Sequence, residues 1–277
     1  MRRIALFALA GVSVLLAALS RPAPAELKTT EFGKGTTIVL VHELGGARMT
    51  WLPVARKLMG THHVVMMDLP GHGDSPLPEP FSIEACGADL AAALAKYDAK
   101  STVLVGLGAG GLVSLAALDK KPDAVAGLML IEAATRSTMD IPDQQQKRFM
   151  EQIDAQYEPF MRAVYGQLAR DSTQAVKLRA DAMRVEPRHI KAYLRYLLKV
   201  DLSSALKKFK GPIMTVVSDR RWPKDKEWPA VAAELGYADA LKVDARRIEG
   251  SGYMIHMDQP DSLAALIGEF TTAAVKR

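Results

Sequence analysis

The feature that most constrains the fold is an alternation of short apolar runs with longer amphipathic stretches. Each apolar run has five or six residues, and the runs are 37–42, 63–68, 102–106, 127–132 and 212–217. Runs of this length with almost no polar residue are typical of strands that are covered on both faces. Helical patterns at 50–59, 82–97 and 109–119 separate them. The alternation predicts an α/β fold with a mostly parallel central sheet flanked by helices.

A long helical segment interrupts this alternation. Between residues 142 and 208 the sequence has no strand-like run, and apolar side chains recur there at three- and four-residue steps. Such spacing marks amphipathic helices. We therefore predict a core formed by residues 26–137 and 206–277, with residues 138–205 inserted as a helical cap. Most apolar side chains of the cap are expected to pack on the core, and a few are expected to line a pocket beneath it.

The first 25 residues have the pattern of a secretory signal peptide. Arg2 and Arg3 precede an apolar run from Ile4 to Leu19, and small residues end the segment at Ala25. The run is short for a membrane span, which usually needs about 20 apolar residues. Removal of the segment is therefore favoured over its retention as a membrane anchor. We expect the mature protein to be periplasmic or secreted.

Composition limits the partners that the chain can have. The formal net charge of +5 includes three arginines and no acid within the first 25 residues, so the mature chain gives little reason to expect nucleic acid or an anionic membrane. The single cysteine excludes an internal disulfide. No metal site is expected, because the adjacent His62 and His63 would point to opposite faces of a strand and no cysteine and histidine cluster has ligand spacing. No cofactor is implied either.

Four short segments, in a fixed order, carry a resemblance to a known family. They read LVHELGGARMTW from residue 40, VVMMDLPGHGDSP from residue 64, LVGLGAGG from residue 104 and GSGYMIHMDQPDSL from residue 250. They resemble the oxyanion loop, the DLPGHGxS loop, the nucleophile elbow and the histidine segment of α/β-hydrolases, in the branch of esterases and lactonases. The resemblance extends from Phe32 to Phe270 apart from the cap, and it implies the α/β-hydrolase fold.

The same resemblance places unusual residues at the triad positions. Gly108 stands at the nucleophile position, and it has no side chain that could form a covalent intermediate. Tyr253 stands at the histidine position, and a phenol with a pKa of about 10 is a poor general base at neutral pH. Arg221 stands at the acid position. Glu132, at the end of an earlier strand, is either a surviving acid or a polar strand end paired with a neighbouring donor. We favour the second, because no histidine is present to be oriented.

The backbone donors of such a site are expected to remain. By resemblance, the N–H groups of Leu44 and Ala109 would form the oxyanion hole, beside His42 and the start of a helix. His256 aligns with a second, structural histidine, and we expect it to hold a turn through hydrogen bonds. Glu43 replaces the usual glycine after His42. We expect Glu43 to face outward, because burial of an unpaired carboxylate is costly; an inward position, as a base toward water, is the alternative.

Two functions compete on this basis. The first is a degenerate hydrolase, a pseudoenzyme that binds a small, partly apolar ligand under the cap. The second is an enzyme of the same fold that opens esters or lactones, or acts as a lyase, with displaced chemistry from Glu43, Glu132 or Tyr253. A protein interaction module on the face of the cap ranks last, because a solvated charged face has the same pattern. The expected partner is a small-molecule ligand or substrate, with no stable membrane contact after removal of the signal peptide.

Overall fold

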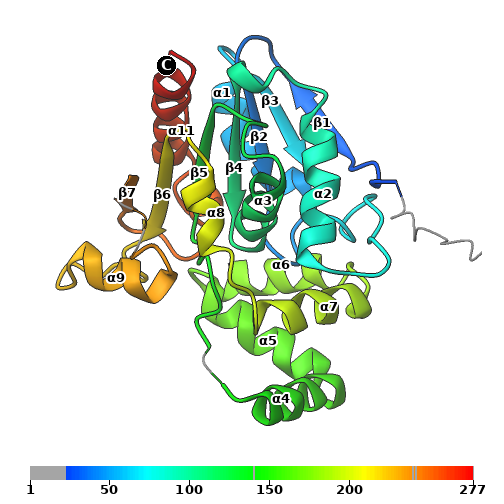
Figure 1. Ribbon diagram of the computed structural model, residues 1–277. Helices are drawn as coiled ribbons and strands as arrows, with labels where there is room; N and C mark the ends of the chain where they lie inside the picture. The colour runs from blue at the N-terminus through cyan, green and yellow to red at the C-terminus, as the bar shows by residue number, and fades with distance from the viewer. Residues whose placement is uncertain (1–22, 140, 239, 241, 277) are drawn as a thin grey trace, which may run out of the picture.

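A seven-stranded sheet forms the centre of the molecule (Figure 1). The computed structural model describes residues 23–139, 141–238, 240 and 242–276, so most of the predicted signal peptide lies outside the described residues. The strands are β1 (Thr29–Phe32), β2 (Thr37–Val41), β3 (His63–Met67), β4 (Thr102–Leu107), β5 (Gly127–Ile131), β6 (Ile213–Ser218) and β7 (Val243–Ile248). Their order is β1-β3-β2-β4-β5-β6-β7, and all neighbours are parallel except β1 and β3.

The prediction of a mostly parallel sheet is confirmed, and the five predicted strands correspond to β2 to β6. Strands β2, β4, β5 and β6 are buried along their whole length, which explains their continuous apolar sequences. The sequence prediction missed β1 and β7, the two edge strands. β7 reads VDARRI and alternates between exposed and partly buried residues, so it lacks the apolar run that identifies a central strand.

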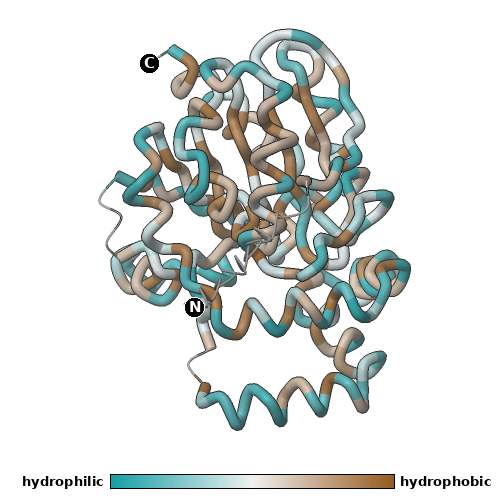
Figure 2. The backbone as a smooth tube through the Cα atoms, turned by 45° about the vertical axis from the view of Figure 1, so that its right-hand side comes forward, coloured by the Kyte–Doolittle hydropathy of each residue, from teal (hydrophilic) through white to brown (hydrophobic). Residues whose placement is uncertain are grey.

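Helices cover both faces of the sheet (Figure 1). Helices α2 and α3 pack on one face with α8 beside α3, and α1 and α11 pack on the other. The bounds are α1 (Leu52–Leu58), α2 (Ile83–Leu94), α3 (Ala109–Lys120), α8 (Ser203–Lys208), α9 (Trp228–Leu235), α10 (Ile255–Asp258) and α11 (Pro260–Val275), with short 3-10 turns η1 (Arg48–Trp51) and η2 (Ala99–Ser101). Apolar residues concentrate in the sheet (Figure 2). In the part of the chain that the structure describes, no helix is both long and apolar enough to cross a membrane.

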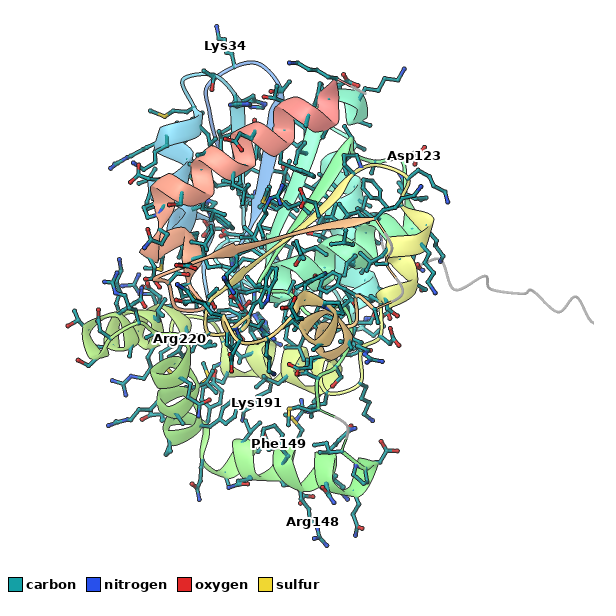
Figure 3. The ribbon with its side chains drawn as sticks, turned by 90° about the vertical axis from the view of Figure 1, so that its left-hand side faces the viewer. Lys34, Asp123, Arg148, Phe149, Lys191 and Arg220 are labelled. Atoms are coloured by element: carbon teal, nitrogen blue, oxygen red, sulfur yellow. The ribbon has the colours of Figure 1, made fainter. Side chains whose placement is uncertain are left out.

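A layer of helices between β5 and β6 lies over one end of the sheet (Figure 1). We call this layer the cap; it consists of α4 (Asp143–Ala155), α5 (Tyr157–Leu168), α6 (Ser172–Ala182) and α7 (Pro187–Leu197). Helix α4 is the outermost. Its Phe149 points toward the rest of the cap, where it packs near Leu198, whereas Arg148 points away (Figure 3). The cap therefore has an apolar inner side and a charged outer side.

Hydrogen bonds fix the cap to the core. The hydroxyl of Tyr193, on α7, donates to the carbonyl oxygen of Pro70 at 3.0 Å. The guanidinium of Arg220, after β6, donates to the carbonyl oxygen of Ala169 at 3.1 Å, at the end of α5 (Figure 3). These bonds join the cap to loops that follow β3 and β6, so the space between cap and sheet has a defined shape.

The parallel strands bring distant residues together at the edge below the cap. Glu43 follows β2, Gly108 follows β4, Glu132 follows β5, and Arg221 follows β6. Strands that run in the same direction end at the same edge of a sheet. The crevice outside the carboxyl ends of the strands is where open α/β sheets bind ligands. A functional site is therefore expected at this edge of the sheet.

The turn between β4 and α3 is packed too tightly for side chains. A Cβ on Gly106 would lie 2.6 Å from Cα of Gly111, and a Cβ on Gly110 would lie 2.5 Å from the carbonyl oxygen of His42. Both neighbours are backbone atoms, which move only if the helix or the sheet moves. The small residues on either side of Gly108 are therefore required by packing.

Gly106→Ala is expected to lower the free energy of unfolding by about 1–3 kcal/mol, because the new methyl group overpacks this turn. Gly268→Ala on α11 is the matched control. The nearest atom to its new Cβ would be Cδ2 of Leu58 at 3.8 Å, and alanine is more stable than glycine in a helix interior by about 0.5–1 kcal/mol. Urea unfolding followed by circular dichroism measures both variants. A Gly106→Ala variant as stable as wild type would contradict the packing described.

Candidate functional site

Gly108 lies at the apex of the elbow between β4 and α3. Its φ of 50° and ψ of −112° belong to a region that favours glycine. Its N–H donates to the carbonyl oxygen of Ile131 at 2.9 Å. A Cβ at this position would overlap Oε2 of Glu43 and crowd the hydroxyl of Tyr253. Other side chains therefore fill the place where a nucleophile would stand.

The side chain of Glu43 points into the site. Its Oε2 accepts hydrogen bonds from the N–H of Ala109 and from the hydroxyl of Tyr253, each at 2.9 Å. The expectation that Glu43 faces outward is therefore wrong. The inward position is stable because the carboxylate is not unpaired: a backbone donor and a phenol replace the water that burial removes. Glu43 thereby uses the Ala109 donor that the resemblance assigns to the oxyanion hole.

Burial also sets the protonation of Glu43. It raises the pKa of this carboxyl group to about 7, and the hydrogen bonds from Tyr253, Ala109 and Leu44 oppose the rise without cancelling it. The start of α3 favours the ionised form, because a helix N-terminus carries partial positive charge. Glu43 therefore gains or loses its proton near neutral pH.

Tyr253 lies before α10, at the predicted histidine position, and donates its hydroxyl to Glu43. Burial raises the pKa of Tyr253 well above its ordinary value, and the nearby carboxylate of Glu43 raises it further. The phenol therefore stays protonated and acts as a donor, not as a base. The guanidinium of Arg221 lies 5.9 Å from the centroid of the Tyr253 ring, within the range of a cation–π contact.

Glu132 and Arg221 form an ion pair beside Tyr253. Glu132 is 2% exposed; its Oε2 accepts from Nε of Arg221 at 2.9 Å, and its Oε1 accepts from the N–H of Ser218 at 2.5 Å. Burial raises the pKa of Glu132, against the opposing charge of Arg221. Both oxygens have partners, as expected of a polar strand end paired with neighbouring donors. Each oxygen of Glu132 therefore already accepts one hydrogen bond, from Ser218 or from Arg221.

His42 supports the oxyanion loop from behind. Its Nδ1 donates to the carbonyl oxygen of Glu43 at 2.8 Å, and its Nε2 accepts from the N–H of Leu69 at 3.0 Å. Burial lowers the pKa of His42 to about 4, so the ring is neutral at physiological pH. Its role in the structure is to hold the loop that carries Glu43.

Two further side chains hold this loop, and the sequence analysis did not single them out. Nε2 of His72 accepts from the N–H of Gly45 at 3.0 Å, and the hydroxyl of Tyr165 donates to the carbonyl oxygen of Leu44 at 2.9 Å. His72 belongs to the DLPGHGDS segment, so the sequence contained a motif that could have identified it. Tyr165 comes from α5 of the cap, 121 residues away from its partner, and no local pattern could have found it.

His256 does not form the hydrogen bonds that the sequence analysis predicts. Neither ring nitrogen has a hydrogen-bonding partner among the described residues, and the ring centroid lies 4.8 Å from that of Trp51. Burial lowers the pKa of His256 to about 3. The prediction failed because the ring is held by packing against Trp51. The imidazole also lines a cavity of ≈ 20 Å³ beside Glu43.

A cavity of ≈ 350 Å³ lies between the elbow and the cap. Its polar floor includes Glu43, Gly108 and Tyr253, and its walls include Phe160 and Leu194 from the cap. A wider groove of ≈ 1060 Å³ lies on the other side of the oxyanion loop and contains none of the triad positions. Among the described residues, no three His, Cys, Asp or Glu side chains are grouped closely enough to hold a metal ion. The cavity above Gly108 is therefore the candidate ligand site.

Sequence comparison defines the class to which this fold and elbow belong. A family model described as the alpha/beta hydrolase family matches residues 38–266, and the chain belongs to this family. The biotin biosynthesis bifunctional protein BioHC of Cellvibrio japonicus is 27% identical over 247 residues, which is 84% of this chain and 47% of that protein. A pimeloyl-[acyl-carrier protein] methyl ester esterase of Xanthomonas oryzae pv. oryzae is 25% identical over 259 residues, 87% of this chain and 97% of that enzyme.

Other relatives match only part of their own length. An esterase with the same name from Neisseria meningitidis is 39% identical over 103 residues, 37% of this chain and 32% of that enzyme. The match thus spans less than half of that enzyme and of the bifunctional protein. Among solved structures, a thermophilic esterase from Thermogutta terrifontis has a TM-score of 0.74 at 24% identity, covering 92% of this chain and 97% of its own. At this identity the likeness shows the fold alone.

The pKa of Glu43 predicts a specific pH dependence of stability. Since this pKa rises from an ordinary 4.5 to about 7 on folding, the folded protein binds the proton more tightly than the unfolded chain. Its contribution to stability is present below pH 4.5 and is lost as the pH rises to about 7. Over this range the free energy of unfolding of wild type should fall relative to that of Glu43→Gln, by about 1–3 kcal/mol.

Chemical denaturation at a series of pH values measures this difference. Glu158→Gln, an exposed glutamate on α5, is the matched control and should follow wild type. Parallel pH curves for wild type and Glu43→Gln would show that Glu43 is not buried in the site.

Proposed function

We propose that the protein is a non-catalytic member of its family that binds a small, partly apolar molecule between the core and the cap. The proposal rests on one observation: the carboxylate of Glu43 occupies both the space of a nucleophile side chain and the Ala109 donor of the oxyanion hole. With the predicted signal peptide removed, this binding would take place in the periplasm or outside the cell.

The occupied elbow supports a loss of ester hydrolysis. A serine mechanism needs a nucleophile, a base and a free oxyanion hole. Gly108 supplies no nucleophile, the phenol of Tyr253 is held as a donor, and Glu43 uses the Ala109 N–H. Loss of a whole triad costs about a million-fold in turnover. The residual rate that a free oxyanion hole would provide is lost as well, because the hole is filled.

The cavity supports binding. A volume of ≈ 350 Å³ is within the range of small-molecule sites, which combine apolar walls with a few polar groups. Leu112 and Ala134 from the core add to the apolar walls that the cap provides. The cap thus still borders a ligand-sized space, and the floor of that space has no nucleophile.

The mature protein should hydrolyse a panel of activated esters no faster than buffer does, and a fluorophosphonate probe should not label it. Both measurements use the same sample, with mass spectrometry reporting any covalent adduct. Robust turnover together with labelling would refute a non-catalytic function, because the probe requires an activated nucleophile.

The overlap at the elbow gives a second test. Gly108→Ser should lower the free energy of unfolding by about 1–3 kcal/mol, because its side chain clashes with Glu43 and its φ is strained. Adding Glu43→Gly should restore part of this loss, because it removes the clash with the carboxylate but neither the strained φ nor the contact with Tyr253, so the two substitutions should be coupled in a double-mutant cycle. Additive effects would mean that Glu43 does not occupy the nucleophile space.

A second candidate function is hydrolysis, or a lyase step, with Glu43 as a general base and Tyr253 as the acid. The observation that favours it is the pKa of Glu43, which at about 7 suits proton transfer at neutral pH, together with the hydrogen bond to Tyr253. Such an enzyme would turn over substrate without a covalent intermediate, and Glu43→Gln and Tyr253→Phe would each abolish the activity. Turnover that survives both substitutions would exclude this mechanism.

A further inference from the structure

The polarity of the cavity floor is the reverse of that of an oxyanion hole. An oxyanion hole presents N–H donors to a carbonyl or carboxylate oxygen. Here Oε2 of Glu43 accepts from the N–H of Ala109, and the hydroxyl of Tyr253 also donates to this oxygen. A ligand that approaches the elbow from the cavity therefore meets a carboxyl group that, once ionised, accepts hydrogen bonds and offers none.

Among the described residues no cationic side chain hydrogen-bonds to this carboxylate, although the nearby charge of Arg221 opposes the rise that burial causes in its pKa. Four charged side chains line the space: Glu43, Glu132, Arg136 and Arg221. Arg221 and Glu132 pair with each other at 2.9 Å. Arg136 is exposed and donates to the carbonyl oxygen of Ala233, at the rim. The hydrogen-bond donors to Glu43 are a phenol and backbone N–H groups, all of them neutral, so its negative charge is one that a ligand can complement.

The walls of the cavity determine the chemical character of the rest of the ligand. Phe160 and Val164 from α5, Leu194 from α7 and Leu112 from α3 present apolar surface above the floor. An apolar chain of moderate length would bury its surface against them. A cationic head would then lie at the floor and an apolar body under the cap.

We propose that the cavity above Gly108 binds a primary amine with an apolar body, whose ammonium group donates to the carboxylate of Glu43. This inference rests on the proposed binding function and specifies its ligand class. An ammonium group has three donors and no acceptor, so it complements the floor. A carboxylate would be repelled by Glu43, and an ester carbonyl would find the Ala109 N–H already in use.

Several groups around Glu43 bear on the pH dependence of such binding. The titratable and charged side chains that line the two cavities beside it are Glu132, Arg136, Tyr165, Asp181, Arg221, Tyr253 and His256. Burial raises the pKa of both phenols and lowers the pKa of His256 to about 3, so these three stay neutral near pH 7. Glu43, with a pKa of about 7, changes charge there. Amine affinity should therefore rise between about pH 6 and about pH 8 as Glu43 ionises.

Isothermal titration calorimetry with three matched probes tests the inference: n-octylamine, octan-1-ol and octanoate. At about pH 8 we expect wild type to bind n-octylamine about tenfold or more tighter than octanoate. Glu43→Gln should weaken n-octylamine binding by about tenfold, remove its pH dependence and leave octan-1-ol binding within about threefold. Glu158→Gln, the exposed control, should behave as wild type.

The outcomes separate this inference from the proposed function. Tightest binding of octanoate would overturn the amine assignment, since an acid would then displace Glu43 from its donors, but it would leave a non-catalytic binding protein. Failure of all three probes to bind, or equal amine affinity in wild type and Glu43→Gln, would also overturn the assignment. Ester turnover with covalent labelling would instead overturn the proposed function itself.

Discussion

The contact between the carboxylate of Glu43 and the first N–H of α3 determines the chemistry of this site. In an α/β-hydrolase that N–H group belongs to the oxyanion hole, and the positive end of the helix strengthens it. Here the donor on Ala109 is satisfied from within the molecule, at 2.9 Å. A group that would stabilise a developing charge during catalysis stabilises the side chain of Glu43 instead. The rest of the site is arranged around that carboxylate.

The neighbouring substitutions follow from the position of Glu43. The side chain needs the space above residue 108, and glycine is the residue that leaves it open while accepting a φ of 50°. The hydroxyl of Tyr253 reaches Oε2 of Glu43 and keeps its proton, so it can always donate a hydrogen bond to this oxygen. A neutral histidine could donate from a given ring nitrogen in only one of its two tautomers. Arg221 pairs with Glu132 and lies over the ring of Tyr253, which places a cation near the site without a direct bond to Glu43. Gly108, Tyr253 and Arg221 therefore form one connected arrangement.

The fold could be predicted from sequence because its signals are local. Apolar runs identified the strands buried on both faces, and glycine spacing identified the elbow. The edge strands β1 and β7 were missed because a strand with one exposed side has no such run. The orientation of Glu43 was predicted wrongly for a different reason. Its burial is stable only through Ala109 and Tyr253, which lie 66 and 210 residues away, so the cost of burial cannot be judged from the loop sequence alone. The packing of His256 against Trp51 could not be predicted for the same reason, because the two residues are far apart in the sequence.

Family membership in this chain does not depend on the residues at the triad positions. The features that identify the family are structural: a parallel sheet, a tight elbow with small flanking residues and a loop held by His42 and His72. They depend on packing, and they persist whatever the triad positions carry. Activity depends on side chains that must share one small space, and there Glu43 excludes a nucleophile at position 108. Since the two cannot occupy that space together, a single substitution at either position leaves the site incomplete. The residues at positions 43 and 108 are therefore coupled by the geometry of the elbow.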